Sequence, residues 1–244
     1  MDELTGFSYA YDGERLSGVS AGPAGRATVI LLHGAGNGSK ERLLPLVADF
    51  AAHGFRALAF DFSGHGDSTG ALAELSLRRR FEQAVAVLDA HVPAGDPLVP
   101  VGFSMSGQTV ADLTRHYGRR VAAVGLCAPA VYAPEAWEVP FGDGDGRFSE
   151  IIRTPDSWRT SAALEALAAY EGRAVLVVPG TDTVIPAETT RAVREALSVR
   201  ARHVRLVLPD ADHWLGRWLH DHAADRTALV ESLTAAVAER EPAE

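Results

Sequence analysis

The chain has 244 residues, of which 47% are hydrophobic and 23% are charged, the composition of a globular domain rather than of a disordered segment. Its formal net charge of −9 argues against a nucleic-acid partner, and its one arginine run, Arg78-Arg79-Arg80, is interpreted as a solvated helix face. No stretch approaches the roughly 20 apolar residues that span a membrane, and the N-terminal MDELTGFSYA lacks the apolar run of a secretory signal. The single cysteine, Cys127, fits a reducing compartment, so we expect a cytoplasmic protein.

The first predicted element is an antiparallel hairpin over residues 7–20, in which two alternating runs flank the turn dipeptide Asp12-Gly13. Six later apolar runs are continuous rather than alternating, which predicts strands buried on both faces of a parallel sheet. These runs cover residues 27–34, 55–62, 97–103, 121–128, 173–180 and 203–209. Segments with helical spacing alternate with them at 41–53, 76–91, 105–118, 187–199 and 223–239. The pattern predicts one α/β domain over residues 1–244, with a mostly parallel, doubly wound sheet and helices on both faces.

One interval, residues 129–171, interrupts this alternation. It contains several prolines and no strong strand pattern, and roughly 40 residues are too many for an ordinary connection between two elements. The interval therefore predicts a short lid inserted into the domain. Its aromatic residues Trp137, Phe141, Phe148 and Trp158 are candidates to bind an apolar substrate, and the alternative is that they form the lid's own small core.

Two serines in VGFSMSGQ, residues 101–108, follow a predicted strand and precede a predicted helix. A nucleophilic serine in such a sharp turn needs small residues two positions before and after it, because the strand and helix backbones nearly touch there. Ser104 has Gly102 and Ser106 at these positions, whereas Ser106 would have the bulky Gln108 on one side. The spacing therefore selects Ser104 as the nucleophile and makes Ser106 a small packing residue. The alternative is that Ser104 only caps the helix.

A serine hydroxyl becomes a nucleophile when a histidine accepts its proton and a carboxylate orients that histidine. After a serine of this kind the acid and then the histidine follow along the chain. His213 lies shortly after the last predicted strand, in LPDADHWLG, and is the candidate base. Asp182 follows the strand at 173–180, at the edge where α/β sheets place their sites, and is the candidate acid. Asp210 and Asp212 are expected to shape the loop that carries His213.

The segment His33-Gly34-Ala35-Gly36 follows the first parallel strand, and its glycines allow backbone N–H groups to face a developing oxyanion. We expect the N–H groups of Ala35 and Met105 to form an oxyanion hole. The alternative is a simple glycine turn in which the His33 side chain satisfies loop carbonyls.

In this order, these motifs resemble those of the α/β-hydrolase fold superfamily, in particular its branch of small serine esterases, acylpeptidase-like and lipase-like enzymes. The stretch HGAGNGSKERLLPLVADFAAHGFRALAFDFSGHGDSTG, residues 33–70, looks like that branch's oxyanion loop, helix and D-x-x-G-H-G-x-S segment. The resemblance extends over residues 27–239, and it implies that Asp61 and the turn at 64–66 are structural elements beside the site. The chain departs from the family pattern in two places. Ser106 replaces a frequent glycine, and the turn at 180–182 is one residue shorter than the commoner form.

The expected function is hydrolysis of a carboxylic ester or thioester of a small, apolar substrate through an acyl-enzyme intermediate. Two alternatives use the same fold: an acyltransferase or cyclase that passes the acyl group to a bound acceptor, and a ligand-binding protein without catalysis. The expected partner is a small-molecule acyl substrate, with no metal, cofactor or nucleic acid. The sequence leaves the oligomeric state and the identity of the substrate open.

Overall fold

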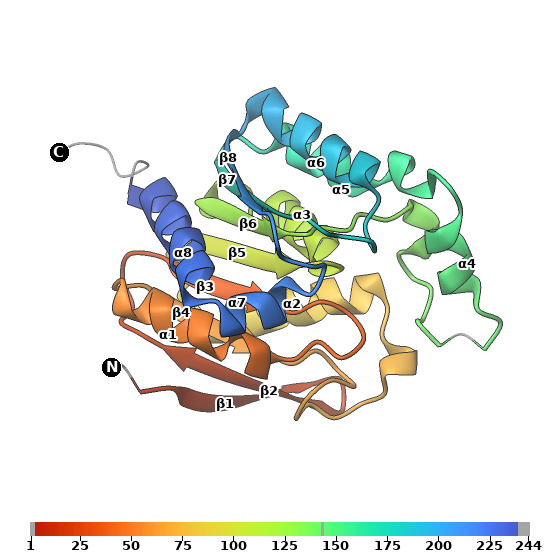
Figure 1. Ribbon diagram of the computed structural model, residues 1–244. Coiled ribbons are helices and arrows are strands. Elements are labelled where there is room, and N and C mark those ends of the chain that lie inside the picture. The colour runs from red at the N-terminus through yellow and green to blue at the C-terminus, as the bar shows by residue number, and fades with distance from the viewer. Residues whose placement is uncertain (1–2, 143, 239–244) are drawn as a thin grey trace.

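The structure is a computed structural model that describes residues 3–142 and 144–238. Eight strands form one sheet in the order β1-β2-β4-β3-β5-β6-β7-β8, as Figure 1 shows. The strands are β1 (Thr5–Tyr11), β2 (Glu14–Ala21), β3 (Thr28–Leu32), β4 (Arg56–Phe60), β5 (Leu98–Phe103), β6 (Ala123–Cys127), β7 (Arg173–Pro179) and β8 (Arg202–Leu208). From β4 to β8 all neighbours in the sheet are parallel, which confirms the predicted mostly parallel sheet.

The N-terminal hairpin is confirmed at the turn that the sequence indicated. Asp12 and Gly13 have φ angles of +48° and +77°, both in the left-handed region, and Tyr11 pairs with Glu14 across this two-residue turn. β2 then joins the sheet by pairing antiparallel with β4, so the hairpin forms one edge of the sheet.

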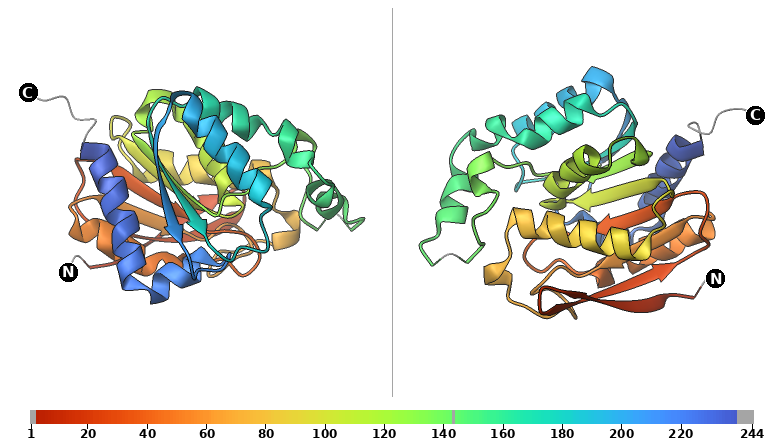
Figure 2. Two further views of the ribbon diagram at one scale, coloured as in Figure 1. Left: turned by 45° about the horizontal axis from the view of Figure 1, so that its top comes forward. Right: turned by 180° about the vertical axis from the view of Figure 1, so that it is seen from behind.

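Helices cover both faces of the sheet, as the alternation of elements predicted (Figures 1 and 2). One apolar core is built with α2 (Leu77–His91), α3 (Ser106–Tyr117), α5 (Ala162–Ala169) and α6 (Ala187–Arg200). The other is built with α1 (Leu44–Ala52), α7 (Leu215–Asp221) and α8 (Ala223–Ala238). The predicted last helix ran to residue 239, which lies outside the described residues.

Strand β8 differs from the prediction that it is buried on both faces. It forms the far edge of the sheet, and Val204 and Val207 are 57% and 41% exposed. The prediction for 203–209 was wrong because an apolar run does not reveal which strand has a neighbour on only one side.

The described residues of 129–171, all but residue 143, contain no strand and form two short helical turns and two helices: Pro134–Ala136, α4 (Arg147–Arg153), Ser157–Thr160 and α5. α4 projects beyond the end of the sheet toward which β5 points, as Figure 1 shows. Within the described part of the chain, no helix combines the length and apolar character needed to cross a membrane.

Candidate active site

Ser104 occupies a sharp turn between β5 and α3. Its φ is +51°, in the left-handed region that residues other than glycine seldom adopt. The Ser104 N–H donates to the carbonyl of Cys127 and the Ser104 carbonyl accepts from the N–H of Ala130, both at 2.9 Å, so neighbouring segments hold this strained conformation. A Cβ added to Gly102 would lie 2.4 Å from the carbonyl oxygen of Ser106. The backbones of β5 and α3 therefore cross at a distance that requires a small residue, as the spacing predicted.

Ser106 is fully buried, and its hydroxyl is used within the fold. It donates to the carbonyl oxygen of His33 at 2.6 Å and accepts from the guanidinium of Arg80 at 2.8 Å. Both partners lie inside the protein, so Ser106 joins α3 to the loop after β3.

His213 connects Ser104 to Asp182 through its two ring nitrogens. Nε2 lies 2.9 Å from Ser104 Oγ, and Nδ1 lies 3.0 Å from Asp182 Oδ2. Because a carboxylate only accepts hydrogen bonds, Nδ1 carries the proton and Nε2 is left free to accept the serine hydroxyl. The serine, histidine and aspartate that we selected from the sequence lie in three separate loops, and the structure brings their side chains together.

The hydrogen bonds around Asp182 favour the charged form of its carboxylate. Its Oδ1 accepts hydrogen bonds from the N–H groups of Val184 and Ile185, at 2.8 and 3.0 Å. Burial alone would raise the pKa of Asp182, but the hydrogen bonds from His213 and from these two N–H groups outweigh it and lower the pKa. The group facing Nδ1 is therefore an anion at neutral pH.

The short turn at 180–182 is accommodated by contacts with the loop that leads to His213. Gly180 N–H donates to the carbonyl of Leu208 at 2.8 Å, and the N–H and hydroxyl of Thr181 both donate to the carbonyl of Ala211, at 3.0 and 2.9 Å. Asp212 accepts hydrogen bonds from Trp214 N–H in its own loop and from Arg217 in α7, the helix that follows. Asp212 thus shapes the loop, in agreement with its expected role.

Gly34, in the loop after β3, lies directly beside the nucleophile turn. A Cβ added to Gly34 would lie 3.3 Å from the Cβ of Ser104. His33 Nδ1 donates to the carbonyl of Gly34 at 2.6 Å, and its Nε2 accepts from Phe62 N–H at 3.1 Å. Burial, followed by the charge of Arg80, holds the pKa of His33 well below its ordinary value, so the ring is neutral.

The bond from His33 to the Gly34 carbonyl also orients the next N–H. In a trans peptide the C=O and N–H point in opposite directions, so the N–H of Ala35 points away from the His33 ring. Among residues 3–142 and 144–238, the N–H groups of Ala35 and Met105 donate to no protein acceptor. Both are therefore available to a ligand.

Arg80 overturns part of the interpretation of the arginine run. Arg78 is exposed and pairs with Glu82, as expected of a solvated face, but Arg80 is completely buried. Its guanidinium donates to the His33 carbonyl at 2.6 Å and lies 3.8 Å from the centre of the Phe62 ring. The available signal was helical spacing, because position 80 shares one face of the helix with Leu77, Ala84 and Val87.

A pocket of about 600 Å³ opens beside Ser104 and His213. Of the four aromatic candidates, Trp158 lines it. Phe148 does not line the pocket; it is buried in an adjoining apolar cluster that includes Met105, and Trp137 and Phe141 pack against this cluster. Ile152, an aliphatic residue of the same interval that could also be expected to line an apolar pocket, lines the pocket too. Pocket residues that the sequence reasoning did not select include Tyr132, Val184, Ile185 and Trp214. Three of them adjoin selected residues, because Val184 and Ile185 follow Asp182 and Trp214 follows His213; this proximity was the available signal.

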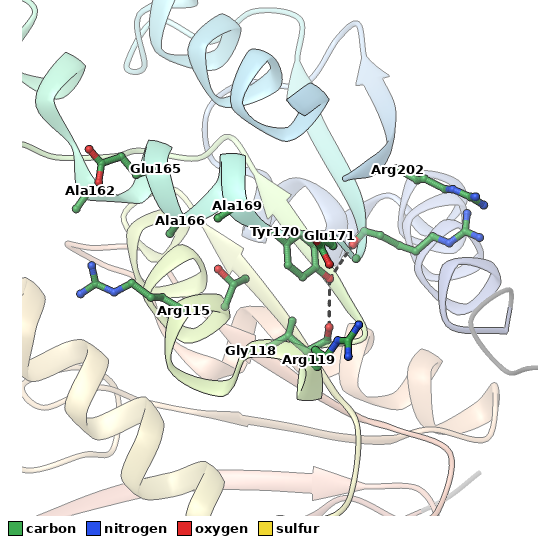
Figure 3. Close-up of a pocket in the computed structure, with 14 residues that line it drawn as sticks. Arg115, Gly118, Arg119, Ala162, Glu165, Ala166, Ala169, Tyr170, Glu171 and Arg202 are labelled. Atoms are coloured by element: carbon green, nitrogen blue, oxygen red, sulfur yellow. Dashed lines mark hydrogen bonds between the residues drawn. The ribbon is translucent and has the colours of Figure 1, made fainter. Parts of the chain in front are cut away.

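A second pocket of about 600 Å³ lies at the opposite edge of the sheet, where β7 and β8 begin (Figure 3). The Tyr170 hydroxyl, near its centre, donates to the carbonyls of Val121 and Arg173, at 3.4 and 3.3 Å. Ligands of open α/β sheets bind at the carboxyl ends of the strands, where Ser104 lies. The pocket beside Ser104 is therefore the better candidate for a reaction site. No group of three histidine, cysteine or acidic side chains suited to a metal occurs within 3–142 and 144–238.

Comparisons with known proteins agree with this fold. A thioesterase domain from the curacin biosynthetic pathway is 16% identical, with a TM-score of 0.72 over 94% of this chain and 100% of that chain. Est1E from Butyrivibrio proteoclasticus, solved with ferulic acid, is 18% identical, with a TM-score of 0.72 over 95% and 99%. An enol-lactonase from Burkholderia xenovorans is 19% identical, with a TM-score of 0.68 over 93% and 99%.

No curated protein sequence matches this chain. The family model described as serine aminopeptidase, S33, matches residues 23–149, more than half of the 244 residues. This span includes the loop after β3 and the serine turn after β5. The chain therefore belongs to the serine aminopeptidase S33 family of α/β hydrolases.

Proposed function

We propose that this protein is a serine hydrolase that cleaves a carboxylic ester or thioester through an acyl-enzyme intermediate. The observation that carries the proposal is the His213 ring, which lies within hydrogen-bonding distance of both Ser104 Oγ and Asp182 Oδ2. The strained backbone of Ser104 supports it, because such strain is retained where it serves a site.

In the first half of the reaction, Ser104 Oγ attacks the substrate carbonyl carbon while its proton moves to His213 Nε2. Asp182 stabilises the imidazolium that forms. The tetrahedral intermediate then expels the alcohol or thiol, which takes the proton from His213. In the second half, His213 removes a proton from water, the resulting hydroxide attacks the acyl group, and Ser104 leaves with that proton.

The negative oxygen of each tetrahedral intermediate would accept hydrogen bonds from the N–H groups of Ala35 and Met105. Each such donor can contribute about 3 kcal/mol to the transition state. The orientation of the Ala35 N–H away from the His33 ring supports this assignment. The reaction needs no metal or cofactor.

The pocket beside Ser104 would bind the acyl substrate, with Trp158 as one wall. We propose that residues 129–171 act as a lid within a single domain, since Ile152 and Trp158 of this segment line the pocket. Phe148 would then belong to the apolar core of the lid, where its ring centre lies 4.5 Å from that of Phe141.

The test is labelling with a fluorophosphonate, which reacts with activated serines, together with hydrolysis of matched oxyesters and thioesters. The wild-type protein should be labelled and should release product from at least one series. Ser104→Ala should lose both properties, and Ser106→Ala is the matched control. Turnover that persists in Ser104→Ala would refute the proposed nucleophile.

A further inference from the structure

The pocket beside Ser104 is rich in positive charge although the protein as a whole is acidic. The chain has 32 acidic and 23 basic residues, not counting histidine. Among the described residues that line the pocket, three are arginines, Arg42, Arg153 and Arg217, and one is a carboxylate, Asp156. The balance of charge at the pocket is therefore the reverse of the balance over the whole chain.

Two of these arginines form no ion pair with a carboxylate of the described residues. Arg217 pairs with Asp212 at 2.8 Å, and the pocket's carboxylate, Asp156, pairs with Arg159 at 2.9 Å. Within 3–142 and 144–238, no carboxylate lies within 4.0 Å of the guanidinium of Arg42 or Arg153.

The acidic neighbours of these two arginines along the chain do not form ion pairs with them. Glu41, beside Arg42, is 3.5 Å from Lys40. Glu150 precedes Arg153 by one turn of α4, and no ion pair joins the two within the described residues. Among the described residues, no ion pair thus offsets the positive charge that Arg42 and Arg153 bring to the pocket.

The two arginines belong to different walls of the pocket. Arg42 is half-buried and lies against the segment after His213, since a Cβ added to Gly216 would be 4.0 Å from the Arg42 Cβ. Arg153 ends α4, in the segment 129–171. The lining also includes apolar side chains: Leu43, Met105, Ile152, Trp158, Val184, Ile185 and Leu215. Such a lining suits a molecule with an apolar body and a negative group.

We propose that the substrate cleaved at this site carries an anionic group, a carboxylate or a phosphate, separate from the bond that is cleaved, and that Arg42 and Arg153 bind it. This proposal rests on the ester- or thioester-cleaving function proposed above. A guanidinium offers paired N–H donors that match both carboxylate and phosphate oxygens. A cationic pocket on an acidic protein also raises the local concentration of an anionic substrate over that of a neutral one.

The kinetic test uses pairs of substrates that differ only in charge. Monomethyl adipate and the methyl ester of adipamic acid compare a carboxylate with its amide isostere on the acyl side. The butyryl thioesters of phosphopantetheine and pantetheine compare the presence and absence of a phosphate on the leaving-group side. At low salt, kcat/KM should favour the anionic member of at least one pair by about tenfold or more, and the pair that responds locates the anionic group.

Variants connect that preference to the two arginines. Arg42→Gln and Arg153→Gln should each reduce the anionic preference, and the double variant should reduce it about tenfold. The control is Arg205→Gln, which removes an exposed arginine on the edge strand β8 and should leave the preference within about twofold. Raising NaCl from about 20 to about 500 mM should reduce the wild-type preference and leave turnover of the neutral esters nearly unchanged.

Binding to Ser104→Ala separates this proposal from the proposed reaction. Calorimetry with the same four compounds measures charge preference without turnover. If the anionic members bind about tenfold more tightly and lose this advantage in the Arg42→Gln/Arg153→Gln background, the anionic site stands even where no ester is hydrolysed. Equal or weaker binding of the anionic members, or a preference that survives in the double variant, would overturn the proposal while leaving ester hydrolysis intact.

Discussion

The guanidinium of Arg80 donates a 2.6 Å hydrogen bond to the carbonyl oxygen of His33, joining α2 to the loop that approaches the nucleophile. The hydroxyl of Ser106 donates to the same carbonyl, so two donors fix the start of the loop that contains Ala35. Burial lowers the pKa of Arg80 to about 9, which leaves it charged at neutral pH. A buried charge therefore helps to hold a backbone segment to which we assign catalytic function.

We expect Arg80→Met to lower kcat by about tenfold with little change in KM, because a looser loop positions the Ala35 N–H less well for the oxyanion. The substitution also removes a buried charge that has no carboxylate partner among the described residues, so the free energy of unfolding should change by less than about 2 kcal/mol. Steady-state kinetics and urea unfolding measure the two effects. The control is Arg78→Met on the exposed side of the same helix; an equal loss of kcat in both variants would contradict the positional role.

The two serines of the turn should respond differently to removal of their hydroxyls. Ser104→Ala should abolish turnover with no loss of stability, because only the nucleophile is removed. Ser106→Ala should keep most of its kcat but lose about 1–2 kcal/mol of unfolding free energy, since the His33 carbonyl and Arg80 each lose a buried partner. Rates and chemical denaturation of both variants would reveal the reverse pattern if Ser106 were the nucleophile.

Asp182→Asn should reduce kcat by on the order of 10³–10⁴, because an amide can hold the His213 ring in the wrong tautomer and cannot stabilise the imidazolium. Asp212→Asn should have a small effect on rate, since the hydrogen bonds of Asp212 go to Trp214 and to Arg217 in α7 rather than to His213. Circular dichroism should confirm that both variants fold. A large loss in Asp212→Asn beside an active Asp182→Asn would require a different acid.

Asp112, on α3, should make stability depend on pH. It is 7% exposed, and burial raises its pKa to about 7, although the Gln108 amide and Arg115 act in the opposite direction. An unfolded aspartate titrates at about 3.9, so the native state prefers the neutral acid and loses stability as pH rises from about 4 to about 7. Asp112→Asn should remove this loss, so its gain over wild type should be on the order of 4 kcal/mol greater near pH 8 than near pH 4. Urea unfolding at the two pH values measures the difference, and a gain independent of pH would contradict the assignment.

The sheet, the hairpin and the serine turn could be predicted from patterns in the sequence. Continuous apolar runs, the dipeptide Asp12-Gly13 and the small residues around Ser104 act through local backbone geometry, which neighbours along the chain largely dictate. The order of the loops also selected His213 and Asp182, and the structure brings their side chains together with Ser104. Their catalytic roles stay predictions.

The contacts that the side chains of a predicted element make with a distant segment became known from the folded structure. Arg80 is buried and Arg78 is exposed although both lie in one arginine run, because α2 packs with only one face against the loop after β3. Trp158 lines the pocket whereas Phe148 is buried in the apolar cluster that contains Met105, although composition made them equal candidates. Composition and spacing record the apolar character of a segment, but burial and pairing depend on which other segment packs against it, and that is fixed only when the whole chain has folded.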